Sequence, residues 1–309
     1  MEEIVNNQPV VSISCITYNH EKYIRDAIEG FLMQKTSFPM EILIHDDASK
    51  DTTADIIREY EAKHPDIIYP IYQTENQYSK GISISATYQF PRARGKYIAL
   101  CEGDDYWTDP YKLQKQMDFL EANNTCQLVH HNVFIKEQDS KKLRVRHSKN
   151  LKHKVGLYEM VHSNKCTTLS VMFRRAVLEK IKKEALMGGD RILFSAIAVE
   201  GSIGYIDEVM GVYSMHNQGV YTGLRYNKRI EIRLRYYDFV LNNLTFSKKH
   251  IKQLVFNRKI KYYFELFIYY MIKEFNFNKS ILYLFNFMKL TLRHFCSFRF
   301  FFKKNPWYA

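Results

Sequence analysis

The first 135 residues alternate between short apolar runs rich in β-branched residues and longer stretches with helical spacing. The short runs, which we predict to be strands, cover residues 10–17, 41–45, 67–72, 96–101 and 126–135. Helices are predicted at residues 21–34, at 52–63 and from Pro110 onward, where apolar residues recur every three or four positions. Strands separated by such helical segments indicate βαβ units. We therefore predict an α/β fold in which helices flank a mostly parallel sheet.

The middle of the chain has shorter patterns. They predict strands at residues 167–173, 204–206 and 209–215 and helices at 175–183 and 192–199. Five cysteines without a C-x-x-C pair are typical of a reducing compartment. Residues 1–10 lack the apolar region of a secretory signal, and no run of 18 uncharged apolar residues is present, so we expect neither a signal nor a transmembrane helix.

Polar residues follow three of the predicted strands. They are Tyr18, Asn19 and His20 after the first strand, Asp46 and Asp47 after the second, and Asp104 and Asp105 after the strand at 96–101. In open α/β sheets, ligands bind beyond the carboxyl ends of the strands. The sequence therefore predicts a polar ligand site at this edge of the sheet.

Asp104 and Asp105 concentrate negative charge at one strand end. Mg²⁺ is bound in proteins through one or two carboxylates together with substrate phosphates, so the pair could hold a cation that bridges a diphosphate. The alternative is that Asp105 only caps the turn before Tyr106, because Asp is common in turns.

The second cluster, Asp46-Asp47-Ala48-Ser49-Lys50-Asp51, admits two interpretations. Asp51 is predicted to cap the helix that begins at residue 52. Asp47 could accept hydrogen bonds from a nucleobase or a ribose hydroxyl, and Tyr18 could stack on a base.

Three segments in order resemble the family 2 glycosyltransferases. SISCITYNHEKYIRDAIEGFLMQ resembles the opening strand of that family with its T-Y-N turn, ILIHDDASKDTT its D-D-G-S-T-D segment, and GKYIALCEGDDYWTDPYKLQKQMDFL its D-x-D-type metal motif. The resemblance spans about residues 9–135 and continues more weakly to 222 through GGDRILF and EVMGVYSMHNQG. It implies a GT-A fold with a Rossmann-like sheet over residues 1–224, with a nucleotide-sugar half at about 9–135 and an acceptor half at about 136–224.

The resemblance also implies roles for individual residues. Those expected to bind the nucleotide sugar are Thr17, Tyr18, Asp46, Asp47 and Asp104. Asp105 is expected to ligate the metal together with His216, and Asp190 is expected to be the general base. Asp190 could instead be a plain helix cap and His216 purely structural. The sequence departs from the family pattern at Ala48 (usually Gly), Gly189 (often Glu) and Ser214 (usually Arg).

The activity implied by the resemblance is an inverting transfer that depends on Mg²⁺ or Mn²⁺. A sugar would move from a nucleoside diphosphate sugar to a hydroxyl of a glycan or lipid-linked acceptor in the biosynthesis of bacterial surface polysaccharides. A base would take the acceptor proton while the cation stabilises the departing diphosphate. A sugar nucleotidyltransferase is the enzymatic alternative, but CITYNHEKYI lacks the glycine-rich phosphate loop expected of one. A non-catalytic membrane or nucleic-acid adaptor is disfavoured by the intact Asp104, Asp105 and Asp190.

Residues 225–309 differ from the rest of the chain. They carry 18 Lys and Arg against 4 Asp and Glu, and 24 of the 46 aromatic residues, and we predict a helical extension. Apolar helices with Lys and Arg bind anionic membrane surfaces, so residues 251–304 are expected to attach a cytoplasmic enzyme peripherally to the inner face of the cell membrane. Alternatively, these helices pack on one another or on a second subunit, as in a homodimer. Nucleic-acid binding is disfavoured, since the aromatic residues lie in apolar runs and no nucleic-acid-binding motif is present.

Overall fold

The structure, a computed structural model, describes residues 8–138, 142–147, 151–216, 219, 223–244 and 249–293. The chain divides into two compact units, residues 1–217 and residues 218–309. Each unit is described by itself.

The described strands of the first unit form one ten-stranded sheet in the order β3-β2-β1-β4-β9-β6-β10-β5, with β7 paired to β6 and β8 to β10. They are β1 (Val11–Thr17), β2 (Met40–Asp46), β3 (Ile68–Tyr72), β4 (Tyr97–Glu102), β5 (Tyr106–Trp107), β6 (Cys126–Glu137), β7 (Leu143–Val145), β8 (Lys154–Val155), β9 (Met172–Arg174) and β10 (Ser202–Met215). Strands β1 to β4 are mutually parallel, as are β6 and β10, whereas β9 is antiparallel to both β4 and β6. The predicted mostly parallel sheet is confirmed.

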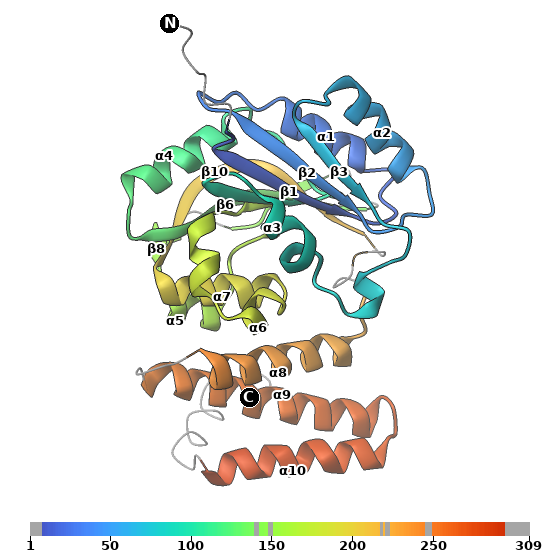
Figure 1. Cartoon of the computed structure of the whole chain (residues 1–309). Coiled ribbons are helices and arrows are strands. Elements are labelled where there is room, and N and C mark those ends of the chain that lie inside the picture. The colour runs from blue at the N-terminus through green and yellow to red at the C-terminus, as the bar shows by residue number, and fades with distance from the viewer. Residues whose placement is uncertain are drawn as a thin grey trace, which may run out of the picture. The chain divides into compact units, whose positions relative to one another are not determined.

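Helices cover both faces of the sheet. They are α1 (Ile24–Leu32), α2 (Thr53–Lys63), α3 (Phe90–Arg92), α4 (Lys112–Ala122), α5 (Leu157–His162), α6 (Lys183–Leu186) and α7 (Asp190–Glu200), with 3₁₀ turns η1 (Tyr78–Lys80), η3 (Thr168–Ser170) and η4 (Arg175–Lys180) and a π-helical turn η2 (Ser85–Gln89). In Figure 1, α1, α2 and α4 lie on one face, and α3, α5, α6 and α7 on the other. Strands β1 and β4 are therefore buried on both faces, which explains the apolar run of β4 and the small residues, Ser12 and Ser14, that alternate with apolar ones in β1.

Register brings the three predicted polar clusters together. Thr17 at the end of β1 pairs with Asp46 of β2, and Ile16 pairs with Glu102 of β4. Because the three strands are parallel and neighbouring, the residues that follow them emerge at one edge of the sheet. The predicted ligand-binding edge therefore combines β1, β2 and β4.

Three local predictions for the middle region were wrong. The helix predicted at 175–183 is a 3₁₀ turn, η4, that ends at Lys180, because Ile181 has an extended backbone conformation. The predicted strand at 167–173 begins with the turn η3, because the Ser170 hydroxyl bonds to the carbonyl of Thr167 (2.7 Å) and accepts its amide (3.3 Å). Such local side-chain bonds compete with a strand ladder. The two predicted strands at 204–206 and 209–215 are one strand, β10, with a register shift between Ile206 and Val209. The exposed Asp207 and Glu208 fall in this irregularity, which lets two polar residues interrupt an otherwise buried strand.

The second unit consists, in its described part, of helices α8 (Tyr226–Asn243), α9 (Lys249–Ile272) and α10 (Phe277–Arg293). Its interior contains Leu234 and Val240 of α8 and Val255 and Leu266 of α9, all buried. Tyr270 of α9 stacks on Tyr283 of α10 with 5.4 Å between ring centroids. Among the described helices, none combines the length and hydropathy that crossing a bilayer requires. The predicted helical extension is confirmed for these residues.

Candidate functional site

Three carboxylates gather where β4 ends. Ligand oxygens of Glu102, Asp104 and Asp105 lie within 4.8 Å of one another. The turn that carries them packs closely on β1, since a Cβ atom placed on Gly103 would lie 2.7 Å from the Thr17 Oγ1. Glycine is therefore required at this position, and the close approach places the carboxylates beside the end of β1.

Asp105 is almost completely buried, with 1% of its surface exposed. Its Oδ1 accepts the backbone amide of Ser214 in β10 (2.8 Å), and its Oδ2 has no hydrogen-bond partner among the described residues. Burial, and then the charge of Asp104, raise the pKa of Asp105 well above its ordinary value. Since its carboxylate bonds to a distant strand, Asp105 is not simply the cap of its own turn. A buried carboxylate oxygen without a donor, next to two further carboxylates, fits a hard divalent cation.

His216 reaches this cluster from the end of β10, 112 residues along the chain. Its Nε2 donates to the Asp104 Oδ2 (2.9 Å), and the Nε2 of His20 lies 3.7 Å from the same oxygen. Burial acts to raise the pKa of Asp104, but the hydrogen bond from His216 and the charges of both histidines outweigh it, so that pKa is lowered. The structure thus brings His216 and both aspartates of the predicted metal motif into one cluster.

Asp190 is the first residue of α7, and its carboxylate accepts a hydrogen bond from the Thr168 hydroxyl of η3. Burial raises the pKa of Asp190, although the bond from Thr168 acts in the opposite direction. Asp190 also lies close enough to Glu102 for its charge, after burial, to raise the pKa of Glu102 well above the ordinary value. A carboxylate with a raised pKa beside the acidic cluster has the properties of a general base.

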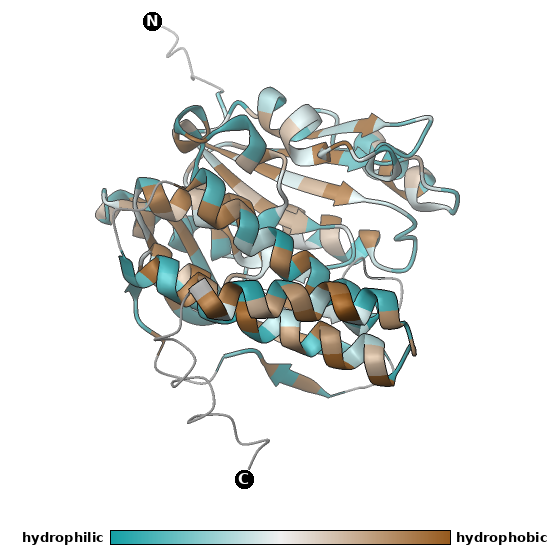
Figure 2. Ribbon diagram, turned by 90° about the horizontal axis from the view of Figure 1, so that it is seen from below, coloured by the Kyte–Doolittle hydropathy of each residue, from teal (hydrophilic) through white to brown (hydrophobic). Residues whose placement is uncertain are grey.

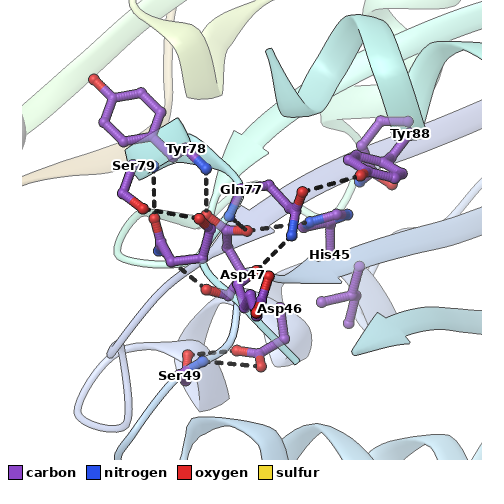
Figure 3. A network of polar contacts seen from close by, with 12 residues as sticks. His45, Asp46, Asp47, Ser49, Gln77, Tyr78, Ser79 and Tyr88 are labelled. Carbon is purple, nitrogen blue, oxygen red and sulfur yellow. Dashed lines mark hydrogen bonds and ion pairs between the residues drawn. The ribbon is translucent and has the colours of Figure 1, made fainter. Parts of the chain in front are cut away.

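The residues predicted to bind the nucleotide lie at the ends of β1 and β2. Thr17 is buried and its hydroxyl has no described partner, whereas Tyr18 is 38% exposed. Asp46 accepts both the amide and the hydroxyl of Ser49 (Figure 3). Burial raises the pKa of Asp46. These contacts hold the loop after β2 against the sheet edge.

Asp47 has a structural partner on each carboxylate oxygen. Its Oδ1 accepts the backbone amide of Gln77 (2.8 Å) and its Oδ2 that of Tyr78 (3.0 Å), as Figure 3 shows. Asp47 therefore fixes the segment that enters η1. The N-cap of α2 is Thr52 and not the predicted Asp51, but Asp51 precedes it and its Oδ1 accepts the amide of Thr53, the first residue of the helix (3.0 Å).

Two residues of the site, Glu102 and Thr168, had no role in the sequence interpretation, and His20 was noted there only as a member of the polar cluster after the first strand. Glu102 could have been found, because it is the last residue of β4 and directly precedes the turn that carries Asp104 and Asp105. Nothing in the local sequence singles out Thr168, whose importance comes from its contact with a residue 22 positions away.

Comparison with known proteins assigns the family. The sequence model described as "Glycosyl transferase family 2" matches residues 12–182, more than half of the chain. This protein therefore belongs to glycosyl transferase family 2.

Individual relatives agree with that assignment. An uncharacterised protein of Mycobacterium tuberculosis (strain ATCC 25618 / H37Rv) is 37% identical over 213 residues, which are 68% of this chain and 60% of that protein. The match thus spans less than two thirds of that relative. The UDP-Glc:alpha-D-GlcNAc-diphosphoundecaprenol beta-1,3-glucosyltransferase WfaP of Escherichia coli is 35% identical over 113 residues, 37% of this chain and 42% of that protein.

A comparison of structures gives a similar fold. TarS residues 1–349 of S. aureus, crystallised in complex with UDP-GlcNAc, superposes with a TM-score of 0.66 at 18% identity, covering 91% of this chain and 81% of that chain. At this identity the likeness concerns the fold alone. The predicted GT-A fold is confirmed.

Proposed function

We propose that this chain is an inverting, metal-dependent glycosyltransferase. It transfers a sugar from a nucleoside diphosphate sugar to a hydroxyl of a glycan or lipid-linked acceptor in the assembly of a surface polysaccharide. The observation that carries the proposal is that Asp105, whose buried Oδ2 has no partner among the described residues, lies in one carboxylate cluster with Glu102, and that Asp190 is near enough to Glu102 for its charge to raise the pKa of Glu102. The E. coli relative, whose name states a UDP-glucose donor and a diphosphoundecaprenol-linked acceptor, supports the proposed classes of substrate.

Asp105 is the main protein ligand proposed for Mg²⁺ or Mn²⁺, with Asp104, Glu102 and His216 beside it. The oxygen-rich set suits a hard cation, and among the described residues no donor competes for the buried Asp105 Oδ2. When bound, the cation would neutralise charge on the departing nucleoside diphosphate.

Asp190 is the proposed general base. The Thr168 hydroxyl holds one of its carboxylate oxygens, which fixes the orientation of the group. Because burial raises its pKa, the carboxylate is better matched to accept a proton from an acceptor hydroxyl near neutral pH. Attack of that hydroxyl on the sugar from the side opposite the diphosphate inverts the anomeric centre.

The nucleotide is proposed to lie over the ends of β1 and β2. The buried Thr17 hydroxyl offers a hydrogen-bonding group, and the exposed ring of Tyr18 can stack on a base. Asp46 and Asp47 would complete the pocket through the loops that they hold. Residues 9–135 then form the nucleotide-sugar half and residues 136–224 the acceptor half of a catalytic domain.

Asp105→Asn tests the reaction, with the exposed Asp66→Asn as the matched control. We expect Asp105→Asn to lose metal-dependent turnover of nucleotide sugars and the increase in Tm that a nucleoside diphosphate and Mn²⁺ give the wild type. A screen of UDP, GDP, dTDP and CMP with and without Mn²⁺ identifies the donor base. Full activity of a folded Asp105→Asn variant would contradict the metal assignment.

The second unit is proposed to attach the enzyme to the inner face of the cell membrane. On α10, Phe277, Ile281, Phe285, Met288 and Leu292 are each at least half exposed and recur every three or four residues, which puts them on one side of the helix. The hydrophobic positions can be followed along the helices nearest the viewer in Figure 2. A lipid surface is the occupant favoured by charge, since residues 225–309 carry 18 Lys and Arg against 4 acidic residues.

The predicted membrane segment, 251–304, extends beyond the described residues after Arg293, so the proposal rests on α9 and α10. Its test is flotation with vesicles of phosphatidylglycerol and phosphatidylcholine. We expect Ile281→Gln/Phe285→Gln to lose binding, and the exposed Val199→Gln of the first unit to retain it. If the double variant floats like the wild type, the face does not bind lipid. Conversion of a wild-type dimer to a monomer by the same variant would identify a second copy as the occupant instead.

A further inference from the structure

Lys112, the first residue of α4, is completely buried. Its Nζ donates to the Oε1 of Gln116 (2.7 Å) and lies 3.8 Å from the centroid of the Trp107 ring. Within the described part of the chain, no carboxylate pairs with it. An ammonium group taken out of water without a counter-charge destabilises a fold, and burial accordingly lowers the pKa of Lys112 to about 7. An apolar side chain of similar length would cost less at this position.

Trp107, one neighbour of Lys112, links the turn that carries Asp105 to η3. Trp107 follows Asp105 by two residues and belongs to β5, which pairs with β10 through Gly211 and Val212. Its indole Nε1 donates to the carbonyl of Leu169 in η3 (2.9 Å). The ring of Trp107 thus joins the turn that carries Asp105 to the turn that carries Thr168.

Gln116, the other neighbour of Lys112, also contacts the turn η3. The Nε2 of Gln116 donates to the carbonyl of Ser170 (2.8 Å), next to the Leu169 carbonyl that Trp107 holds. An amide side chain can be placed either way round, and the bond from Lys112 to Oε1 favours the same orientation as the carbonyls of Ser170 and Val129 (3.4 Å), to which Nε2 donates. Lys112 therefore contacts both side chains that hold η3, and Thr168 of η3 in turn holds Asp190.

We propose that Lys112 is a positioning residue for the transfer reaction. By orienting Trp107 and Gln116 together, it fixes the turn of Asp105 and the turn of Thr168 relative to each other, and so sets the separation of metal ligand and base. The inference rests on the proposed function. It explains why a buried cation occupies a place where an apolar residue would give a more stable fold.

The variant that tests this is Lys112→Met, with the exposed Lys63→Met of α2 as control. We expect Lys112→Met to have a Tm several degrees above wild type, a kcat at least tenfold lower, and a dissociation constant for the donor within twofold of wild type by calorimetry. A merely structural lysine would leave kcat per folded molecule unchanged. Lys63→Met should match the wild type in all three measurements.

Gln116→Leu supplies an independent variant if Lys112→Met does not fold, and the same loss of kcat is expected. Since the two residues act as one unit, the double variant should be no slower than the slower single variant. A kcat within twofold of wild type in a folded Lys112→Met or Gln116→Leu, or losses that multiply in the double variant, would overturn the inference while leaving the proposed function intact. If the wild type transfers no sugar from any donor, the proposed function and the positioning role of Lys112 are both wrong.

Discussion

Lys112 should make the stability of this protein depend on pH in a range where most carboxylates no longer titrate. Burial holds the pKa of the folded Lys112 at about 7, whereas an unfolded lysine has a pKa of about 10.4. Below pH 7 both states bind the proton, and the folded state bears the full cost of the buried charge. Above pH 7 the folded chain loses a proton that the unfolded chain still binds, so the free energy of unfolding rises by up to about 1.4 kcal/mol per pH unit. The gain between pH 7 and pH 9 is about 2 kcal/mol.

Urea unfolding of wild type and Lys112→Met, followed by circular dichroism at pH 7, 8 and 9, measures this contribution. The difference between the two proteins removes titrations that they share. Cys101 of β4 and His131 of β6 face Lys112, but neither titrates in this window. Burial raises the pKa of the Cys101 thiol well above 9.0 and, together with the charge of Lys112, lowers the pKa of His131 well below 6.5.

The variant should be the more stable protein at pH 7, and its advantage should shrink by about 2 kcal/mol by pH 9. An advantage that is constant from pH 7 to pH 9 would show that Lys112 does not change its protonation there, and the reasoning from its burial would be refuted.

Three further substitutions test the site and its support. Asp190→Asn should reduce turnover by about 10² or more while donor affinity by calorimetry stays within twofold, and unchanged turnover would exclude a base at this position. Gly103→Ala would place its Cβ 2.7 Å from the Thr17 Oγ1, so a loss of stability of about 1–3 kcal/mol and weaker donor binding are expected in thermal and binding assays. Gln89→Leu removes hydrogen bonds to the carbonyls of Cys15 (2.9 Å) and Leu43 (2.8 Å), and urea unfolding should reveal a cost of about 1–3 kcal/mol. A midpoint equal to wild type would mean that these bonds add nothing.

The parts of this fold that follow from local sequence were predictable. Strands β1, β2 and β4 are buried on both faces and their sequences are short and rich in β-branched and other apolar residues, and the polar residues that follow them mark the functional edge. The turn η3 was mistaken for a strand because Ser170 makes hydrogen bonds that a periodic pattern does not register.

Other features depend on contacts between distant segments. Both oxygens of Asp47 accept backbone amides 30 and 31 residues further along the chain, a structural role that the sequence did not predict. Lys112 stands at the start of an amphipathic helix, where a lysine is ordinarily solvated, and only the packing of Trp107 over it reveals that it is buried. The spacing of residues along one sequence reveals neither the hydrogen bonds between distant segments nor the packing that buries a lysine.

The place of β9 in the sheet limits how this site can move. This strand of three residues lies between β4, which leads to the metal-motif carboxylates, and β6, the neighbour of β10, and it is hydrogen-bonded to both. The two sides of the site are therefore joined by continuous backbone hydrogen bonding, and they cannot move apart unless hydrogen bonds of the sheet break. Any movement that admits a ligand to this edge is then expected in the loops that follow the strands, and not in the sheet itself.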